Sequence, residues 1–541
     1  MSQSVPRSRV RRAVALAALT LVGACRSAAS HRQSADREVY AILEQRRAEL
    51  GAGTTHFSIE PEPGPLREKL QRGEVLPPLD FVAALMVAAE NSRAYQSEKE
   101  SLYLKALDLT LARYQFRVQM SGTVGAALSS DPQNGDDASL DGGPTFRRVL
   151  GTGAAIVGSL VFSFVRDIST GDMFRLRSSF NLEVTQPLLA GFGERIAMEP
   201  LTQAERDVVY EVRSFERFRR TFAVNVASSY FAILQQADQV SNERVNMENL
   251  IVLRERNEAL ALAGRLSDIQ VDQARQDELR SRNRIIQAEE RLASLLDDFK
   301  LFLGLPVLAK IELDSSELGD LEVDETLDVS ADLAITTALA RRLDLQTSLD
   351  QVDDSQRRVE IAEDALRSVL DLRANVSGDS PTSDPAHYAK DDLSWTLGVE
   401  WDLPLDQLAE RNDYRESLIT LDRSRRSAEQ LSDQIQADLR DSVRQAQTRL
   451  QSLQIQQGAV QLAERRIEST TLNLQAGRAD TRDILEAQEA LLEARNAATQ
   501  ARIDYHLSQL ALWRDMELLR VDESGIRLER DSLGAPRQEN P

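Results

Sequence analysis

The side chains that most often carry out catalysis are few in this chain and stand far apart. Its single cysteine, Cys25, excludes an intrachain disulfide and a zinc site built from cysteines. No Ser-His-Asp arrangement or P-loop is present, and Gly151-Thr-Gly153 lacks the third glycine of a dinucleotide-binding motif. The four histidines are scattered, and none has the spacing of metal ligands: His31, His56, His387 and His506. The sequence therefore predicts a protein that is not an enzyme and holds no cofactor and no metal.

The charge balance narrows the choice of partners. The 541 residues include 86 Asp and Glu against 65 Lys and Arg, for a formal charge of −21. Nucleic-acid binding needs a basic patch, so the acid excess argues against it. No apolar run reaches the roughly 18 to 20 residues that a helix needs to cross a bilayer, which excludes an α-helical membrane protein.

Cys25 has one candidate chemistry, which is lipid modification. Arginines between residues 7 and 12 precede a short apolar stretch, Ala13 to Val22, as in an export signal. The segment Leu21-Val22-Gly23-Ala24-Cys25 resembles the bacterial lipobox, which implies removal of residues 1–24 and acylation of Cys25. The alternative is an ordinary cleavable signal that precedes a free cysteine. Arg26 stands where an aspartate would retain a lipoprotein in the inner membrane, and this favours the outer membrane.

Long helices dominate the rest of the pattern. A tract from about residue 200 to 302 contains a single glycine, Gly264, and another from about 407 to 519 contains only Gly458 and Gly477. Both have apolar residues that step by threes and fours, as in a coiled coil with polar interruptions. At about 1.5 Å per residue, the stretch from residue 200 to Gly264 would extend about 100 Å. Shorter helical patterns are found at 34–50 and 79–116.

Four segments instead alternate apolar and polar residues with a period of two. Each is about ten residues long, the length of a strand that crosses a membrane at a tilt. A half-buried strand of a soluble sheet has the same period, so each segment taken alone favours that alternative. The segments lie at about 117–129, 174–185, 369–378 and 392–403. In a membrane, their apolar faces would present Phe174, Phe180, Trp395 and Trp401 to lipid.

The arrangement of these segments favours the membrane. The order helix, strand, loop, strand, long helix, turn, helix occurs twice. Val184-Thr-Gln-Pro187 recurs as Trp401-Asp-Leu-Pro404, and Ala263-Gly-Arg265 recurs as Ala476-Gly-Arg478. The chain is therefore predicted to be an internal duplication. Four membrane strands cannot close a barrel, and an open edge in lipid leaves backbone groups unpaired, so the chain must oligomerise. A trimer gives 12 strands and a dimer gives eight.

The segment Gln475-Ala-Gly-Arg-Ala-Asp-Thr-Arg-Asp-Ile-Leu-Glu-Ala-Gln488 resembles the second periplasmic helical turn of the TolC-type outer-membrane efflux channels. The resemblance covers about residues 76–520 and is closest to the lipoprotein branch of that family. It implies a mainly α fold with membrane β structure: a homotrimeric 12-stranded outer-membrane β-barrel, four strands per chain, continued by a long periplasmic α-helical barrel. It also implies a passive channel of a tripartite efflux or type I secretion system, which docks an inner-membrane pump through a periplasmic adaptor.

Two sets of site residues follow from the resemblance. Asp483 and Glu486 match acidic residues that ring the closed periplasmic mouth and favour cations. The alternative is that they only stabilise a helix N-terminus through its dipole. The residues of the two helical turns are expected to contact the adaptor: Gly264, Arg265, Gly477 and Arg478. The alternative is that each glycine only supplies the positive φ that the turn needs.

The sequence departs from the family at the gate. The family's gate arginine, two residues after the turn glycine, aligns with Ala479, between Arg478 and Arg482. The locking contacts are therefore expected to differ. The loop at about 129–173 is long, and its apolar run Ala154–Val165 is explained equally by an extra strand, a plug or a cell-surface feature.

The predicted organisation follows from these boundaries: signal peptide 1–24, acylated extension and linker 25–75, first repeat 76–306, linker 307–330, second repeat 331–520 and flexible tail 521–541. A lipid-anchored periplasmic coiled-coil scaffold or adaptor protein is the alternative. It explains the coiled-coil pattern of the long helices but not the four duplicated strands of membrane length.

Overall fold

The computed structural model describes residues 27–49, 57–60, 66–73, 77–131, 135–167, 175–319, 321, 329–380, 388, 393–522 and 525–529. The chain divides into two compact units. The first comprises Met1–Phe57, Leu102–Val212 and Gln356–Ile419, and the second comprises Ser58–Ser101, Arg213–Ser355 and Thr420–Pro541. Cys25 and Phe174 lie outside the described residues.

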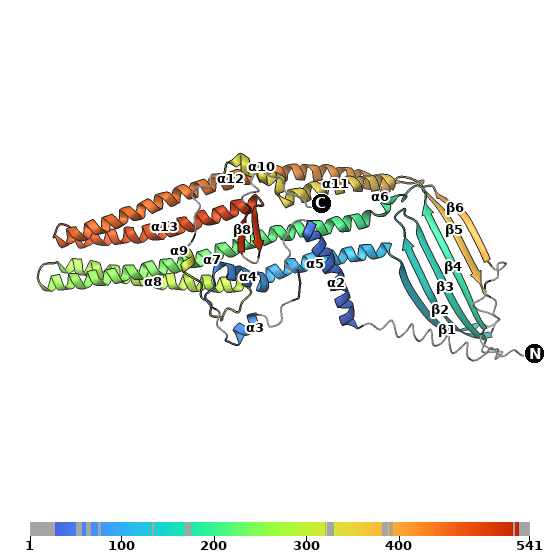
Figure 1. Cartoon of the computed structure of the whole chain (residues 1–541), viewed down its shortest axis with the longest axis horizontal. Helices are drawn as coiled ribbons and strands as arrows, with labels where there is room; N and C mark the ends of the chain where they lie inside the picture. Colours follow the sequence, from blue (N-terminus) through green and yellow to red (C-terminus); the bar gives the residue numbers. More distant parts are fainter. Residues whose placement is uncertain are drawn as a thin grey trace, which may run out of the picture. The chain divides into compact units, whose positions relative to one another are not determined.

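The first unit contains one antiparallel sheet whose spatial order follows the sequence order from β1 to β6 (Figure 1). Both edges, β1 and β6, pair on one side only. The strands are β1 (Gln119–Asp131), β2 (Gly135–Val149), β3 (Ala155–Asp167), β4 (Arg175–Pro187), β5 (Val369–Asp379) and β6 (Leu393–Asp402).

The prediction of four strands per chain is therefore wrong, because the long loop between the first two predicted strands contains β2 and β3. Neither strand has the alternation that reveals a half-buried strand. Acidic residues and Gly142-Gly143-Pro144 in β2 are typical of turns, while in β3 Val157 and Val161 make the second face partly apolar as well. Both strands form because neighbouring strands pair with them along most of their length, although the β2–β3 register is interrupted at Gly143 and Pro144.

The helices of the two repeats correspond closely, which confirms the predicted duplication. Helix α4 (Phe81–Asn91) and helix α10 (Ala331–Arg341) each have 11 residues and a side-chain N-cap, Asp80 and Ser330 respectively. One extended residue, Ser92 or Arg342, separates each from the next helix, α5 (Arg93–Phe116) or α11 (Leu343–Asp364).

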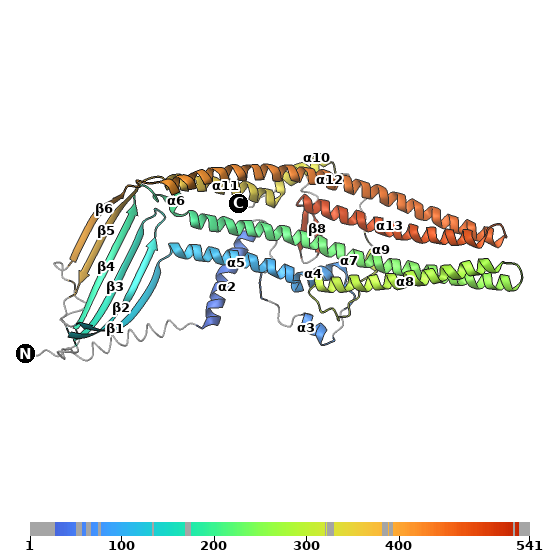
Figure 2. The same ribbon diagram turned by 180° about the vertical axis from the view of Figure 1, so that it is seen from behind.

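Two helical hairpins follow the strands of the two repeats (Figures 1 and 2). Helix α7 (Glu199–Leu262) turns into α8 (Asp268–Phe302), and α12 (Leu408–Gln475) turns into α13 (Thr481–Asp515). Helices α8 and α13 have 35 residues each. The core of the second unit lies among α4, α7, α8, α10 and α13 and contains the fully buried Tyr230, Phe299 and Trp513.

Shorter elements complete the two units. Helix α2 (Ala28–Glu49) packs on α5 in the first unit, where the Tyr103 hydroxyl donates to Asp36 over 2.7 Å. Short helices are α3 (Leu66–Gln71), α6 (Glu194–Ala197) and α9 (Ser316–Gly319). Strands β7 (Leu519–Asp522) and β8 (Gly525–Leu528) pair with each other, so residues 521–522 and 525–528 are not part of a flexible tail as predicted.

Candidate functional site

The pairing register gives the six-stranded sheet one continuous apolar face. Met120 of β1 pairs with Phe146 of β2, and Leu140 of β2 pairs with Phe164 of β3. Further along the sheet, Leu182 of β4 pairs with Val376 of β5, which pairs with Trp395 of β6. The even-numbered residues of β1 to β5 and the odd-numbered residues of β6 thus share one face. Many of these apolar side chains are exposed: Met120, Val124, Leu128, Leu140, Phe146, Phe162, Leu182, Val376, Trp395, Leu397, Val399 and Trp401.

The opposite face of the sheet is mostly polar. It presents, for example, Thr123 of β1, Thr145 of β2, Asn181 of β4 and Asn375 of β5. The amide of Asn375 donates to the side-chain oxygen of Asn181 over 2.6 Å. A sheet with one exposed apolar face and one polar face matches a membrane barrel, which is apolar outside and polar inside.

The side chains that were predicted to face lipid differ in how far they are exposed. Trp395 and Trp401 are 75% and 60% exposed on the apolar face. Phe180 is half-buried on the same face and packs edge-to-face against Tyr388, with ring centroids 5.0 Å apart. The Ser178 and Tyr388 hydroxyl oxygens are 2.6 Å apart.

The two glycine turns have the same geometry. Gly264 and Gly477 have φ values of +71° and +67°, which only glycine adopts without strain. The residue after each glycine donates its backbone N–H to a carbonyl five residues earlier, Arg265 to Leu260 over 2.9 Å and Arg478 to Asn473 over 2.8 Å. These bonds close each long helix in a Schellman-type cap. Both arginine side chains are exposed, and neither guanidinium has an ion-pair partner among the described residues.

The two acidic candidates after the second turn are held differently. Both are exposed on α13. The Asp483 carboxylate accepts the Asp480 backbone N–H over 2.8 Å, so it also caps the helix. The Glu486 carboxylate lies 2.9 Å from the Arg482 guanidinium and 3.8 Å from that of Arg466. Glu486 therefore has two basic partners, whereas Asp483 has no ion-pair partner in the part of the chain that the structure describes.

A buried polar cluster joins the two helical hairpins near their turns. Asn257 of α7 and Thr481 of α13 are 2% and 1% exposed, and the Asn257 amide donates to the Thr481 hydroxyl over 3.0 Å. The Thr481 hydroxyl lies 3.4 Å from the side-chain oxygen of Gln270 in α8. Sequence reasoning missed this contact, because an amide and a hydroxyl 224 residues apart leave no motif.

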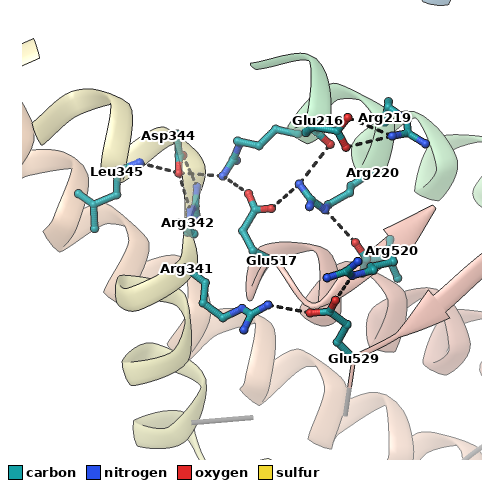
Figure 3. Close-up of polar contacts among 12 residues, drawn as sticks. Glu216, Arg219, Arg220, Arg341, Arg342, Asp344, Leu345, Glu517, Arg520 and Glu529 are labelled. Atoms are coloured by element: carbon teal, nitrogen blue, oxygen red, sulfur yellow. Dashed lines mark hydrogen bonds and ion pairs between the residues drawn. The ribbon is translucent and has the colours of Figure 1, made fainter. Parts of the chain in front are cut away.

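A second cluster of charges, further from the turns, is structural. Glu517 forms an ion pair with Arg220 at 2.6 Å (Figure 3). It also forms one with Arg217 at 3.2 Å, and the Arg217 guanidinium lies 2.8 Å from the Asp344 carboxylate. Burial opposes the ionisation of Asp344, but hydrogen bonds from Arg342 and the positive charges around it lower its pKa below the ordinary value. These bonds connect α7, the α10–α11 junction and the segment before β7.

The described residues contain no group of three or more His, Cys, Asp or Glu side chains that could hold a metal ion. Within the same residues, no helix is both long enough and apolar enough to span a bilayer.

Known proteins with this sequence pattern and this fold are outer-membrane channels. A family model described as "Outer membrane efflux protein" matches residues 334–514. No curated protein matches the chain. These findings confirm the resemblance to the TolC-type channels, in sequence over the second repeat and in fold over most of the chain.

Three solved structures illustrate the shared fold. VceC of Vibrio cholerae is 14% identical, with a TM-score of 0.58 over 81% of this chain and 95% of its own. CmeC of Campylobacter jejuni is 14% identical, with a TM-score of 0.59 over 81% of this chain and 85% of its own. The open state of MtrE from Neisseria gonorrhoeae is 11% identical, with a TM-score of 0.59 over 81% and 88% respectively.

Proposed function

We propose that this chain, whose second repeat is an outer membrane efflux protein domain on the fold of that family's channels, forms a homotrimeric outer-membrane channel. It passively conducts substrates that an inner-membrane pump and a periplasmic adaptor deliver, in a tripartite efflux or type I secretion system. The observation that supports this most strongly is the single apolar face that runs through all six strands. A soluble sheet would bury such a face, whereas in this chain many of its apolar side chains are exposed.

The turns are the proposed contact with the adaptor. Each turn presents an exposed arginine next to a glycine, Arg265 beside Gly264 and Arg478 beside Gly477, and neither arginine has an ion-pair partner among the residues described above. Because both turns have the same backbone geometry, three chains would offer six similar basic tips. A partner with acidic or polar helical hairpin ends would complement them.

Asp483 is the proposed main contributor to an acidic ring at the periplasmic mouth. Among the described residues no basic side chain forms an ion pair with its carboxylate, so three copies would place uncompensated negative charge at a constriction. Glu486 contributes less, because Arg482 and Arg466 of the same chain balance its charge.

The proposed location is the outer membrane, with the helical hairpins in the periplasm. Acylation of Cys25 would add a lipid anchor, and mass spectrometry of the purified N-terminal peptide would test it. A chain found with an unmodified Cys25 would contradict the anchor and leave the channel proposal intact.

Ion selectivity in planar bilayers tests the channel and the ring together. We expect cation-selective pores, with a reversal potential in a salt gradient that moves toward zero in Asp483→Asn and moves less in Glu486→Gln. Arg482→Gln should raise cation selectivity, because it exposes the charge of Glu486. Asp483→Glu is the control, since it keeps the charge.

The outcomes separate the two claims. Absence of pores from well-folded protein would contradict the channel function. Pores whose selectivity is unchanged in Asp483→Asn would contradict only the acidic ring.

A further inference from the structure

The strand count has a consequence for the width of the barrel. We infer that three copies of this chain close an 18-stranded barrel, in which β2 and β3 are full membrane strands and β6 of one copy pairs with β1 of the next. This inference rests on the proposed function. It assigns an interaction surface, the two sheet edges, to a second copy of the same chain.

The added hairpin extends the apolar face of the sheet, although its own alternation is incomplete. All of β1, from Gln119 to Asp131, pairs with β2, and β3 pairs with β4 from Ala155 to Val165. Phe146 and Phe162 of the added strands lie on the apolar face, in phase with Met120 and Trp395 at the edges. A plug or a cell-surface hairpin has no need for an apolar face in register with four other strands, but a membrane strand does.

The turn between β2 and β3 lies at the end of the sheet nearest the helices and is held there by contacts with the end of β4 and the segment that follows it. Ala154 is buried, and the Thr152 hydroxyl donates to the Gln186 side chain over 3.1 Å. The Gly193 N–H donates to the Thr152 carbonyl over 3.2 Å. Gly153 has a φ of +89°, and a Cβ there would lie 2.5 Å from the Gly191 carbonyl oxygen, so the fit requires glycine. These contacts fix the hairpin as part of the sheet.

The sheet edges favour another copy as the partner. β1 exposes its residues from Met120 to Ser130 and has no proline, lysine or other charged residue between Gln119 and Ser130. Natural sheets protect open edges with such residues, so an unprotected edge of this length favours pairing. Because all neighbours are antiparallel and the strand number is even, β1 and β6 run in opposite directions. β6 of one copy can therefore pair antiparallel with β1 of the next, as closure requires.

The width of the sheet also matches the helices that enter and leave it. In the first unit, hydrogen bonds join neighbouring segments in the order α5, α7, α11, α12: Arg113 to Glu205, Arg357 to Glu199, and Gln407 to the Leu366 carbonyl just after α11. Four helices spaced about 8–10 Å apart occupy about 32–40 Å. Strands about 4.8 Å apart, tilted by about 40°, each take about 6 Å of circumference, so six occupy about 37 Å and four about 25 Å.

A charge scan tests whether β2 and β3 face lipid. Phe162→Asp should reduce the oligomer recovered from the outer membrane at least tenfold, because the charge would enter the lipid-facing surface. Ser163→Asp, the neighbour on the polar face, should stay within twofold of the wild type. Equal recovery of both variants would overturn the inference.

Disulfide cross-linking tests the closure. Thr123→Cys in β1 is combined in turn with Ser394→Cys, Thr396→Cys or Gly398→Cys in β6, all on the polar face, in the full-length chain. Oxidation should give at least one pair that forms a covalent ladder ending at three chains. Thr123→Cys alone, and Thr123→Cys with Ser179→Cys in the central strand β4, are the controls and should give no ladder.

Each other outcome has a defined meaning. A ladder that ends at two chains would indicate a 12-stranded ring of two copies, and no cross-link at any position would exclude this edge pairing; either result overturns the inference. Protein that forms pores in either case would keep the proposed function. Protein that forms no pores would contradict that function as well.

Pore width gives an independent measurement. Barrel diameter grows roughly in proportion to strand number, so the lumen backbone diameter should be about 1.5-fold that of a 12-stranded barrel. Neutral polymers of graded size, added on the barrel side of a bilayer, should reduce conductance up to a correspondingly larger polymer radius. A cut-off equal to that of a 12-stranded reference channel would overturn the inference.

Discussion

At the scale of single residues, the least replaceable polar contact near the turns is the one between Asn257 and Thr481. Both side chains are almost completely buried and bond to each other over 3.0 Å, whereas their contacts with Gln270 are longer, at 3.4 and 3.5 Å. Loss of one partner leaves a buried group unsatisfied, which costs more than the net value of the bond.

Thr481→Val tests this dependence. The substitution keeps the shape and removes the acceptor, so we expect a loss of about 1–3 kcal/mol and a lower thermal midpoint of the detergent-solubilised protein. The double variant Asn257→Leu, Thr481→Val should recover part of the loss. A double variant as unstable as the sum of both single variants would show that the two residues act independently.

His506 is predicted to make the protein sensitive to mild acid. It packs edge-to-face on Phe231, with ring centroids 5.3 Å apart, and burial lowers its pKa from 6.5 to about 4. The unfolded chain then binds more protons than the folded one between pH 6.5 and 4, so stability falls as the pH falls through this window.

His506→Leu should therefore flatten the decline of the thermal midpoint between pH 7 and pH 5. His31→Leu, a change at an exposed histidine, is the control and should keep the wild-type decline. An equal decline in His506→Leu and the wild type would show that other groups cause the acid sensitivity.

At the scale of elements, two glycines of α12 and its turn illustrate opposite roles of the same residue. Gly477 has a φ of +67°, whereas Gly458 lies inside the helix, and a Cβ at either position would meet no atom within 4 Å. The difference between them is therefore backbone conformation and not space.

We expect Gly477→Ala to destabilise the protein by about 1–2 kcal/mol, because an L-residue is strained in the left-handed region. Gly458→Ala should stabilise it by about 1 kcal/mol through helix propensity. Thermal unfolding of both variants checks the two signs. The same sign for both would mean that the turn tolerates a side chain.

The strands also show which parts of the fold can be predicted from the sequence alone. The four strands with clear alternation were predicted to within about two residues of β1, β4, β5 and β6. β2 was not predicted, and the run Ala154–Val165, which forms β3, was predicted only as an extra strand, a plug or a cell-surface feature. The pairing partners that stabilise both strands lie elsewhere in the chain, and the local pattern does not record them. The turn glycines could be predicted, since positive φ leaves a residue-type signal, but the Asn257–Thr481 contact could not.

At the scale of the whole molecule, its three tryptophans divide between two environments. Trp395 and Trp401 are exposed on the apolar face of the sheet, whereas Trp513 is 1% exposed in the core of the second unit. In the membrane, only the first two should contact lipid.

Fluorescence quenching by brominated lipids checks this division. Protein reconstituted in such lipids should be strongly quenched, and Trp395→Phe with Trp401→Phe should remove most of the quenching. Trp513→Phe should leave the quenching of the remaining tryptophans unchanged. Quenching that persists in the double variant would place lipid at Trp513 and contradict the assignment of the apolar face.

Each group of strands begins after one helix and ends before another, and this also limits how such a barrel can evolve. α5 delivers the chain to β1 and α12 receives it from β6, so both ends of the sheet meet the helices at the same side. An inserted segment preserves this only if it adds strands two at a time. Gain or loss of a whole hairpin would then change the calibre of the barrel in steps, while the helical hairpins and their partners keep an unaltered sequence.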